Sequence, residues 1–157
     1  MINVTYSIAK LQDLEEITSL FRNTINTVNT NDYSPQEIKA WSQGADCLEN
    51  WKIRIDTHHF ILAKDKNTLI GMASIDKNGY LDVMYVHHKY QSMRIASTLL
   101  SKSIEHAKSQ GHKEITSDVS ITAKSFFLHK GFEIIKPQLV LCRGVVLRNY
   151  RIKRTIS

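Results

Sequence analysis

The chain contains little cysteine, proline or glycine. Among its 157 residues are two cysteines, two prolines and six glycines. Cys47 and Cys142 form no C-x-x-C pair and lie far apart in the sequence, so they predict free thiols rather than a disulfide framework. No repeat, low-complexity segment or linker interrupts the chain. With 42% hydrophobic residues, the sequence predicts one folded domain over residues 1–157.

Long hydrophobic runs are also absent. No apolar run reaches the ~18 residues that a membrane-spanning helix needs. The first segment, MINVTYSIAKLQDLEE, has neither the basic start nor the apolar centre of a secretion signal. We therefore expect a cytoplasmic protein that does not insert into a membrane.

Basic residues outnumber acidic ones, 21 to 15, which gives a net charge of +6. Most of the basic residues are scattered along the chain. The one dense run, residues 143–154, is typical of a strand end with a solvated terminus. A nucleic-acid partner is therefore not favoured.

The segment MYVHHKYQSMRIASTLL, residues 84–100, predicts a strand, a polar turn and a long helix. A helix start leaves N–H groups unpaired, and these attract anions together with the helix dipole. Turns that hold phosphate usually carry glycines, and this turn has none. Taken alone, the segment favours a plain connector, with a phosphate site as the alternative.

Hydrophobic periodicity predicts the other elements. A Ser34-Pro35-x-Glu37 start indicates a helix capped by Ser34. The segment 44–55 remains open between a loop and a short helix. The last two strands are expected to divide near Lys136–Gln138. Strands are predicted within 2–9, 59–76 (two strands), 77–88, 112–120 and 132–152 (two strands), and helices within 11–25, 34–42, 92–111 and 121–131.

The order of these elements is β-α-α-β-β-β-α-β-α-β-β. Hairpins in the first half and strand–helix–strand units in the second predict an α/β (α+β) fold. Its mixed central sheet would have about six to seven strands, with helices on both faces.

Two motifs resemble those of the GNAT (GCN5-related) N-acetyltransferase superfamily. The first is a Tyr-Val pair followed by Gln/Arg-x-x-Gly-x-Gly/Ala, and the second is Ala-x-x-Phe-Tyr-x-x-x-Gly-Phe. Segments 33–42 and 143–152 also resemble a small bacterial branch of that superfamily. The matching residues are Tyr85, Val86, Gln91, Ile95 and Ala96 in the first motif, and Ala123, Phe126, Gly131 and Phe132 in the second.

The resemblance implies an N-acetyltransferase that uses acetyl-CoA as its cosubstrate and no metal. In the family the strand ends at a bulge beside the thioester, and the turn binds the CoA pyrophosphate. The implied oxyanion donor is a backbone N–H near Met84–Val86. The residues expected at CoA are Met84, Tyr85, Val86, Gln91, Ser92, Met93, Arg94, Ile95, Ala96, Ser97, Ser120 and Phe127.

Three residues depart from the family pattern. Arg94 replaces a glycine; it costs little if the backbone is right-handed, where its guanidinium could bind phosphate. If the position needs a positive φ, Arg94 strains the turn instead. Phe127 stands where the family often has a catalytic tyrosine, and Ser120 where many relatives have asparagine.

Acetyl transfer needs a group that takes the proton of the amine. Asp82 is the only carboxylate on the strand GYLDVMYV and is our candidate base, with a hydrogen-bonded sheet residue as the alternative. Strict alternation would place Tyr80, Asp82 and Met84 on one face. Tyr150 is a candidate acid in place of the missing tyrosine, although a sheet-face aromatic is the plainer interpretation.

The expected acceptor is a primary amine of a small molecule or peptide. The residues predicted to bind it are Tyr33, Trp41, His59 and Tyr80, with His59 as a proton relay or a packed histidine. The histidine pairs do not form a metal signature, because neighbours on a strand face opposite ways. A catalytically impaired acyl-CoA-binding or regulatory domain is the alternative function. The resemblance also makes a homodimer plausible.

Overall fold

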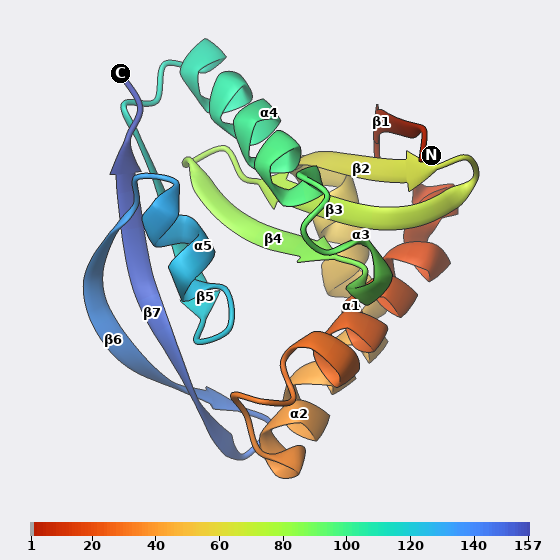
Figure 1. Cartoon of the computed structure of the whole chain (residues 1–157), viewed down its shortest axis with the longest axis vertical. Coiled ribbons are helices and arrows are strands. Elements are labelled where there is room, and N and C mark those ends of the chain that lie inside the picture. The colour runs from red at the N-terminus through yellow and green to blue at the C-terminus, as the bar shows by residue number, and fades with distance from the viewer. Residues whose placement is uncertain (1) are drawn as a thin grey trace.

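A computed structural model describes residues 2–157 and contains a seven-stranded sheet (Figure 1). The strand order is β1-β2-β3-β4-β5-β7-β6, and only the β4–β5 pair is parallel. The predicted mixed sheet is therefore confirmed. The strands are β1 (Val4–Ile8), β2 (His59–Asp65), β3 (Thr68–Ile75), β4 (Tyr80–Val86), β5 (Glu114–Ser120), β6 (Glu133–Cys142) and β7 (Val145–Thr155).

Helices cover both faces of the sheet. The predicted order is confirmed, and the segment that the sequence left open contains a helix, α3. On one face α1–α3 pack around buried Trp51 and Phe60, and on the other α4 and α5 pack around Leu99 and Phe127. The helices are α1 (Leu14–Val28), α2 (Pro35–Ser42), α3 (Leu48–Thr57), α4 (Ile95–Ser109) and α5 (Lys124–His129).

Local sequence explains where α2 begins. At α2 the Ser34 hydroxyl accepts a hydrogen bond from Glu37 N at 3.1 Å, and the Glu37 carboxylate accepts one from Ser34 N at 2.7 Å. This is the predicted capping box.

Within residues 2–157 no helix combines the length and apolar character needed to cross a membrane.

Strand β4 contains a bulge at Asp82. Ser74 of β3 faces Val83, whereas the next residue, Ile75, faces Leu81, so Asp82 is an extra residue in β4. Beyond the bulge Val83 packs with the α1–α3 side of the sheet, and Met84 packs on the α4 side. The predicted placement of Met84 on the face of Asp82 was therefore wrong, because a bulge reverses the alternation.

Strands β4 and β5 separate just before this bulge. Only Tyr80 and Leu81 pair with β5, opposite Thr116 and Ser117. Figure 1 shows the two strands diverging beyond that point. Within residues 2–157 the backbone of 83–86 therefore has no strand partner on the β5 side, and the sheet opens at its centre.

The predicted division of the last two strands near Lys136–Gln138 was wrong. Pro137 lies inside β6, opposite Tyr150, and the hairpin turns at Arg143–Gly144 instead. Strand β6 is the edge of the sheet, where a residue without an N–H is tolerated. Arg143 and Gly144 both have positive φ, 48° and 80°, as a tight two-residue hairpin turn requires.

Tyr33 joins three parts of the chain. Its hydroxyl donates to the Arg148 carbonyl of β7 at 2.6 Å and accepts from Ile121 N, after β5, at 3.0 Å. Its ring meets Trp41 edge-on at 5.2 Å between centroids. Tyr33 is 6% exposed, and we infer that its main role is to fasten the α1–α2 loop to the two strands.

We expect the Tyr33→Phe variant to lower the free energy of unfolding by about 1–3 kcal/mol, because two backbone groups lose their partner. Urea unfolding measures the change. Tyr150→Phe is the matched control, since no hydrogen bond of the Tyr150 hydroxyl occurs within residues 2–157. Equal stability of the two variants would contradict the fastening role.

Candidate active site

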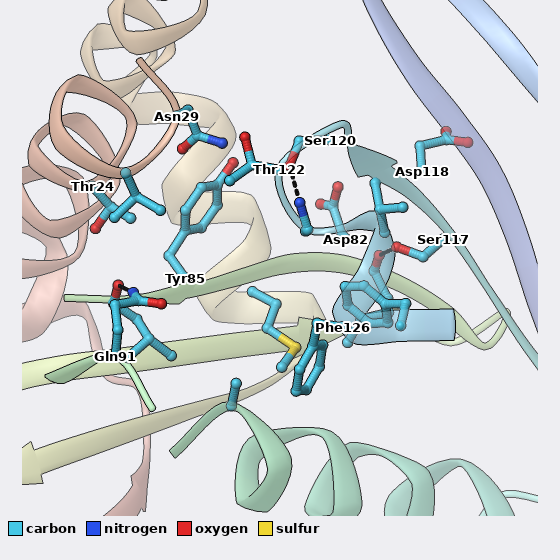
Figure 2. A pocket seen from close by; sticks show the side chains of 18 of the residues that line it. Thr24, Asn29, Asp82, Tyr85, Gln91, Ser117, Asp118, Ser120, Thr122 and Phe126 are labelled. Carbon is cyan, nitrogen blue, oxygen red and sulfur yellow. Dashed lines mark hydrogen bonds between the residues drawn. The ribbon is translucent and has the colours of Figure 1, made fainter. Parts of the chain in front are cut away.

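The opening between β4 and β5 holds a cleft of about 240 Å³. Figure 2 shows its lining side chains converging from four parts of the chain: Thr24 of α1 with Asn29 at its C-cap, Tyr85 of β4, Thr122 of the β5–α5 loop, and Phe126 of α5. The cleft therefore lies where the sheet lacks backbone pairing. An elongated ligand that offers amide groups could replace the missing strand partner there.

A second cavity, of about 390 Å³, lies on the α1–α3 side of the sheet. It is bounded by α1–α3 and the β6–β7 hairpin, and Trp51, Arg54 and Leu147 are among its walls. Five residues line both cavities. They are Trp41, Asp82, Tyr85, Asp118 and Ser120. The two cavities therefore adjoin at these residues.

Asp82 belongs to a small polar chain at this junction. Arg54 Nε donates to Asp82 Oδ2 at 2.8 Å, and His58 Nδ1 lies 3.9 Å from the same oxygen. His58 also contacts the Ser74 hydroxyl at 3.1 Å. Burial lowers the pKa of His58 more than the charge of Asp82 raises it. The imidazole is therefore neutral at neutral pH, and Arg54 is the charged partner of Asp82.

Asp118 has a different environment. Tyr80 Oη donates to Asp118 Oδ2 at 2.9 Å, Gln138 Nε2 donates to Oδ1 at 2.9 Å, and Arg151 donates to both oxygens. Burial by itself would raise the pKa of Asp118, but these hydrogen bonds together lower it below its ordinary value. Burial, followed by the nearby Asp118 charge, raises the pKa of Tyr80. Asp118 is therefore held as an anion and Tyr80 as a phenol.

The turn before α4 contains two left-handed residues. Ser92 and Arg94 have φ of 62° and 64°, and Arg94 is the N-cap of α4. Of the two conditions that the sequence left open for Arg94, the structure shows the positive φ. A side chain there costs about 1–2 kcal/mol relative to the right-handed region.

The same turn exposes backbone donors. The first hydrogen bond inside α4 runs from Thr98 N to the Arg94 carbonyl at 3.1 Å, which leaves the N–H groups of residues 95–97 without a partner inside the helix. Gln91 Nε2 donates to the Val86 carbonyl at 2.6 Å and fastens the turn to the end of β4. Exposed N–H groups at a helix N-terminus suit a phosphate.

The walls of the cleft also have spare hydrogen-bonding capacity. Thr24 Oγ1 and Thr122 Oγ1 are buried, and neither has a partner within residues 2–157. A buried hydroxyl without a partner costs about 1–3 kcal/mol. The pair therefore fits a ligand with amides and hydroxyls, and the α4 turn fits its phosphates. Coenzyme A carries all three groups.

The structure brings most of the predicted CoA residues to the cleft. Met84, Tyr85, Val86, Gln91, Ala96, Ser120 and Phe127 line it. Ile95 is 2% exposed in the core under the turn, whereas Met93 is 47% exposed on its outside. The Ser120 hydroxyl accepts from Ala123 N at 3.0 Å (Figure 2).

Two predicted residues lie elsewhere. His59 stacks on His106 with 3.8 Å between ring centroids, on the α4 side of the sheet. His59 therefore faces away from Asp82, and the neighbouring residue, His58, lies beside that carboxylate instead. Tyr150 lines neither cavity, and its ring lies 4.5 Å from Lys124 Nζ. Tyr33, Trp41 and Tyr80 do line the second cavity.

Sequence reasoning missed Asp118, Arg54 and His58. A carboxylate inside the alternating strand EITSDVS was the available signal for Asp118. No sequence signal pairs Arg54 with Asp82, since 28 residues separate them. Within residues 2–157 no three histidine, cysteine or acidic side chains are placed to hold a metal ion.

Comparison with known proteins defines the class of this molecule. A family model described as an acetyltransferase (GNAT) domain matches residues 29–153. The uncharacterized N-acetyltransferase YafP of Escherichia coli strain K12 is 31% identical over 138 residues, which are 88% of this chain and 87% of YafP. The chain therefore belongs to the GNAT family and is an N-acetyltransferase.

Solved structures agree on the fold. A GCN5-related N-acetyltransferase from Rhodopseudomonas palustris superposes with a TM-score of 0.94 at 22% identity, over 99% of this chain and 98% of that one. PaiA N-acetyltransferase from Thermoplasma acidophilum, solved with coenzyme A, gives 0.83 at 19% identity, over 98% and 99%. YncA from Salmonella typhimurium, solved with acetyl-CoA, gives 0.67 at 18%, over 99% and 95%.

We expect Arg94→Gly to raise the free energy of unfolding by about 1 kcal/mol, because glycine accepts the left-handed backbone. It should leave the affinity for CoA equal or higher. Calorimetric titration with CoA and urea unfolding measure the two effects. Arg94→Ala is the control, because it removes the guanidinium but keeps the Cβ in the strained position.

The control separates the two roles of Arg94. If both variants lose CoA affinity by about tenfold or more, the guanidinium binds phosphate. That outcome would contradict strain as the main effect of Arg94.

Proposed function

We propose that this N-acetyltransferase moves the acetyl group directly from acetyl-CoA to a primary amine in a ternary complex. Acetyl-CoA would occupy the 240 Å³ cleft and the amine the 390 Å³ cavity. The observation that carries this proposal is the set of residues common to both, with Asp82 among them. Holding two reactants at one junction supplies much of the acceleration by itself.

The binding of CoA is assigned to the opened sheet. The free N–H groups at the start of α4 would bind the pyrophosphate, and the pantetheine arm would lie between β4 and β5. The PaiA and YncA structures, which were solved with coenzyme A and acetyl-CoA, support this assignment. The thioester would then lie beside the bulge at Asp82, where N–H groups near Met84–Val86 could stabilise the developing oxyanion.

Asp82 is the better candidate for the base. Its Oδ2 atom is bound by Arg54, but within residues 2–157 nothing donates to its Oδ1 atom. Asp118, by contrast, already accepts bonds at both oxygens. Asp82 can therefore accept the proton of the amine, directly or through water, and neutral His58 can accept a hydrogen bond or a proton beside it.

Tyr85 is our candidate for the acid. Tyr150 lines neither cavity, whereas Tyr85 lines both. Burial raises the pKa of Tyr85 more than the Trp41 side chain lowers it, so the hydroxyl keeps its proton at neutral pH. In Figure 2 the hydroxyl points toward Asn29 and Thr122 inside the cleft. It could protonate the departing CoA thiolate.

The proposal is tested first by calorimetric titration with acetyl-CoA and CoA, followed by a release assay for CoA thiol with a panel of amines. The panel contains polyamines, amino acids, aminoglycosides, lysine peptides and peptides with free N-termini. We expect micromolar binding and turnover with one class of amine. Binding without turnover on any class would contradict direct transfer to an amine.

We expect Asp82→Asn to lower kcat by roughly 10²–10⁴-fold, because the amide cannot accept a proton. The affinity for CoA should stay within about twofold, since the substitution keeps the size of the side chain. Steady-state kinetics measures the loss of kcat, and calorimetric titration measures the affinity for CoA. Asp82→Glu is the control, because it retains a carboxylate.

Two further variants test whether Tyr85 is the general acid. Tyr85→Phe should lower kcat by roughly 10–100-fold, with the larger loss at high pH, because the thiolate then leaves without a proton. Tyr150→Phe should keep the kcat of the parent chain. Equal rates for the two variants would remove Tyr85 from the mechanism and leave transfer without a tyrosine acid.

A further inference from the structure

The two cysteines, 95 positions apart in the sequence (142 minus 47), meet at one guanidinium. Arg143 Nη2 donates to Cys47 Sγ at 3.0 Å, and Arg143 Nη1 donates to Cys142 Sγ at 3.4 Å. Nη1 also donates to the Ala40 carbonyl at 3.1 Å. Both sulfurs are half-buried and line the second cavity. The fork geometry of one arginine therefore holds the two sulfurs near each other.

The two sulfurs have different environments. Cys142 Sγ donates to the Ala40 carbonyl at 3.5 Å. Cys47 Sγ accepts from Arg143 and donates to no group within residues 2–157. Cys47 is also the N-cap of the ten-residue helix α3. A cationic donor and a helix N-terminus are the surroundings in which a cysteine sulfur reacts as an anion.

The geometry points to a peroxide-sensitive thiol pair: we propose that Cys47 attacks a peroxide and that Cys142 then resolves the product into an intramolecular disulfide. This inference does not rest on the proposed acetyl transfer. A soft metal ion shared by the two sulfurs is a poorer explanation, because the guanidinium between them would repel a cation. A peroxide is neutral and small enough to enter the open cavity.

The chemistry balances in two steps. The Cys47 thiolate attacks one oxygen of the peroxide, the O–O bond breaks, and hydroxide or alkoxide leaves; sulfur is oxidised to a sulfenic acid and the peroxide is reduced. The Cys142 sulfur then attacks Cys47 Sγ, the S–O bond breaks, and water leaves with the thiol proton. A dithiol reductant reverses the change.

The bridge would link distant parts of the fold. It would join the start of α3 to the tip of the β6–β7 hairpin and displace the Arg143 guanidinium from both sulfurs. A covalent link across so long a segment stabilises mainly by restricting the unfolded chain. We therefore expect the melting temperature of the oxidised protein to rise by several degrees. Affinity for CoA should not change, since neither cysteine lines the first cleft.

The experiment treats the whole chain with stoichiometric hydrogen peroxide and counts thiols with a maleimide before intact-mass analysis. We expect both thiols to disappear, the chain to lose the mass of two hydrogen atoms, and a non-reducing gel to show monomer. Dithiothreitol should restore both thiols. In Cys142→Ser, dimedone should label Cys47 as a sulfenic acid, whereas Cys47→Ser should stay unlabelled.

Variants of the arginine test its role. Arg143→Gln and Arg143→Lys should each react roughly tenfold more slowly, because neither keeps the two-pronged donor. Lys136→Gln, on the same hairpin, removes one charge without a contact to either sulfur and should react at the parent rate. Thiols that survive peroxide, a cross-link between chains, or sulfonic acids without a bridge would each overturn the proposal.

Discussion

The extra residue in β4 is the constraint on which the site depends. A bulge leaves one residue without a place in the ladder and rotates the strand beyond it. Here that residue is Asp82, and β4 leaves β5 within one residue of it. The bulge therefore lies where the sheet opens, and it turns the Met84 side chain to the α4 side. It also places the Asp82 carboxylate where the two cavities adjoin. A regular strand would not produce these three features together.

Side-chain contacts hold the sheet together around the opening between β4 and β5. Arg54 reaches β4 from α3, Arg151 reaches β5 from β7, and Tyr33 joins β7 to the chain after β5. Two side-chain hydrogen bonds cross between β4 and β5: Tyr80 Oη donates to Asp118 Oδ2 at 2.9 Å, and Ser117 Oγ donates to the Leu81 carbonyl at 2.7 Å. The strained turn at Arg94 fits this pattern: its left-handed backbone is unfavourable in isolation, yet it directs the first N–H groups of α4 outward.

Local patterns made the fold predictable, and non-local contacts limited the prediction of the site. Periodicity and the Ser34–Glu37 capping box act over a few residues, and each element they predicted is present. The turn motif likewise located the cleft. The facing of Met84 was missed because a bulge adds one residue without a sequence mark. His59 was preferred to His58 because strand position alone does not say which neighbour faces Asp82.

The two carboxylates at the junction show how environment assigns roles to identical groups. Asp118 is held by a guanidinium, a phenol and an amide, so its negative charge is fixed. Asp82 has one charged partner and a neutral imidazole beside it. A fixed anion can attract a cationic amine but cannot readily accept its proton, whereas a carboxylate with one free oxygen can. Within the proposed function, Asp118 would attract the incoming amine and Asp82 would take its proton.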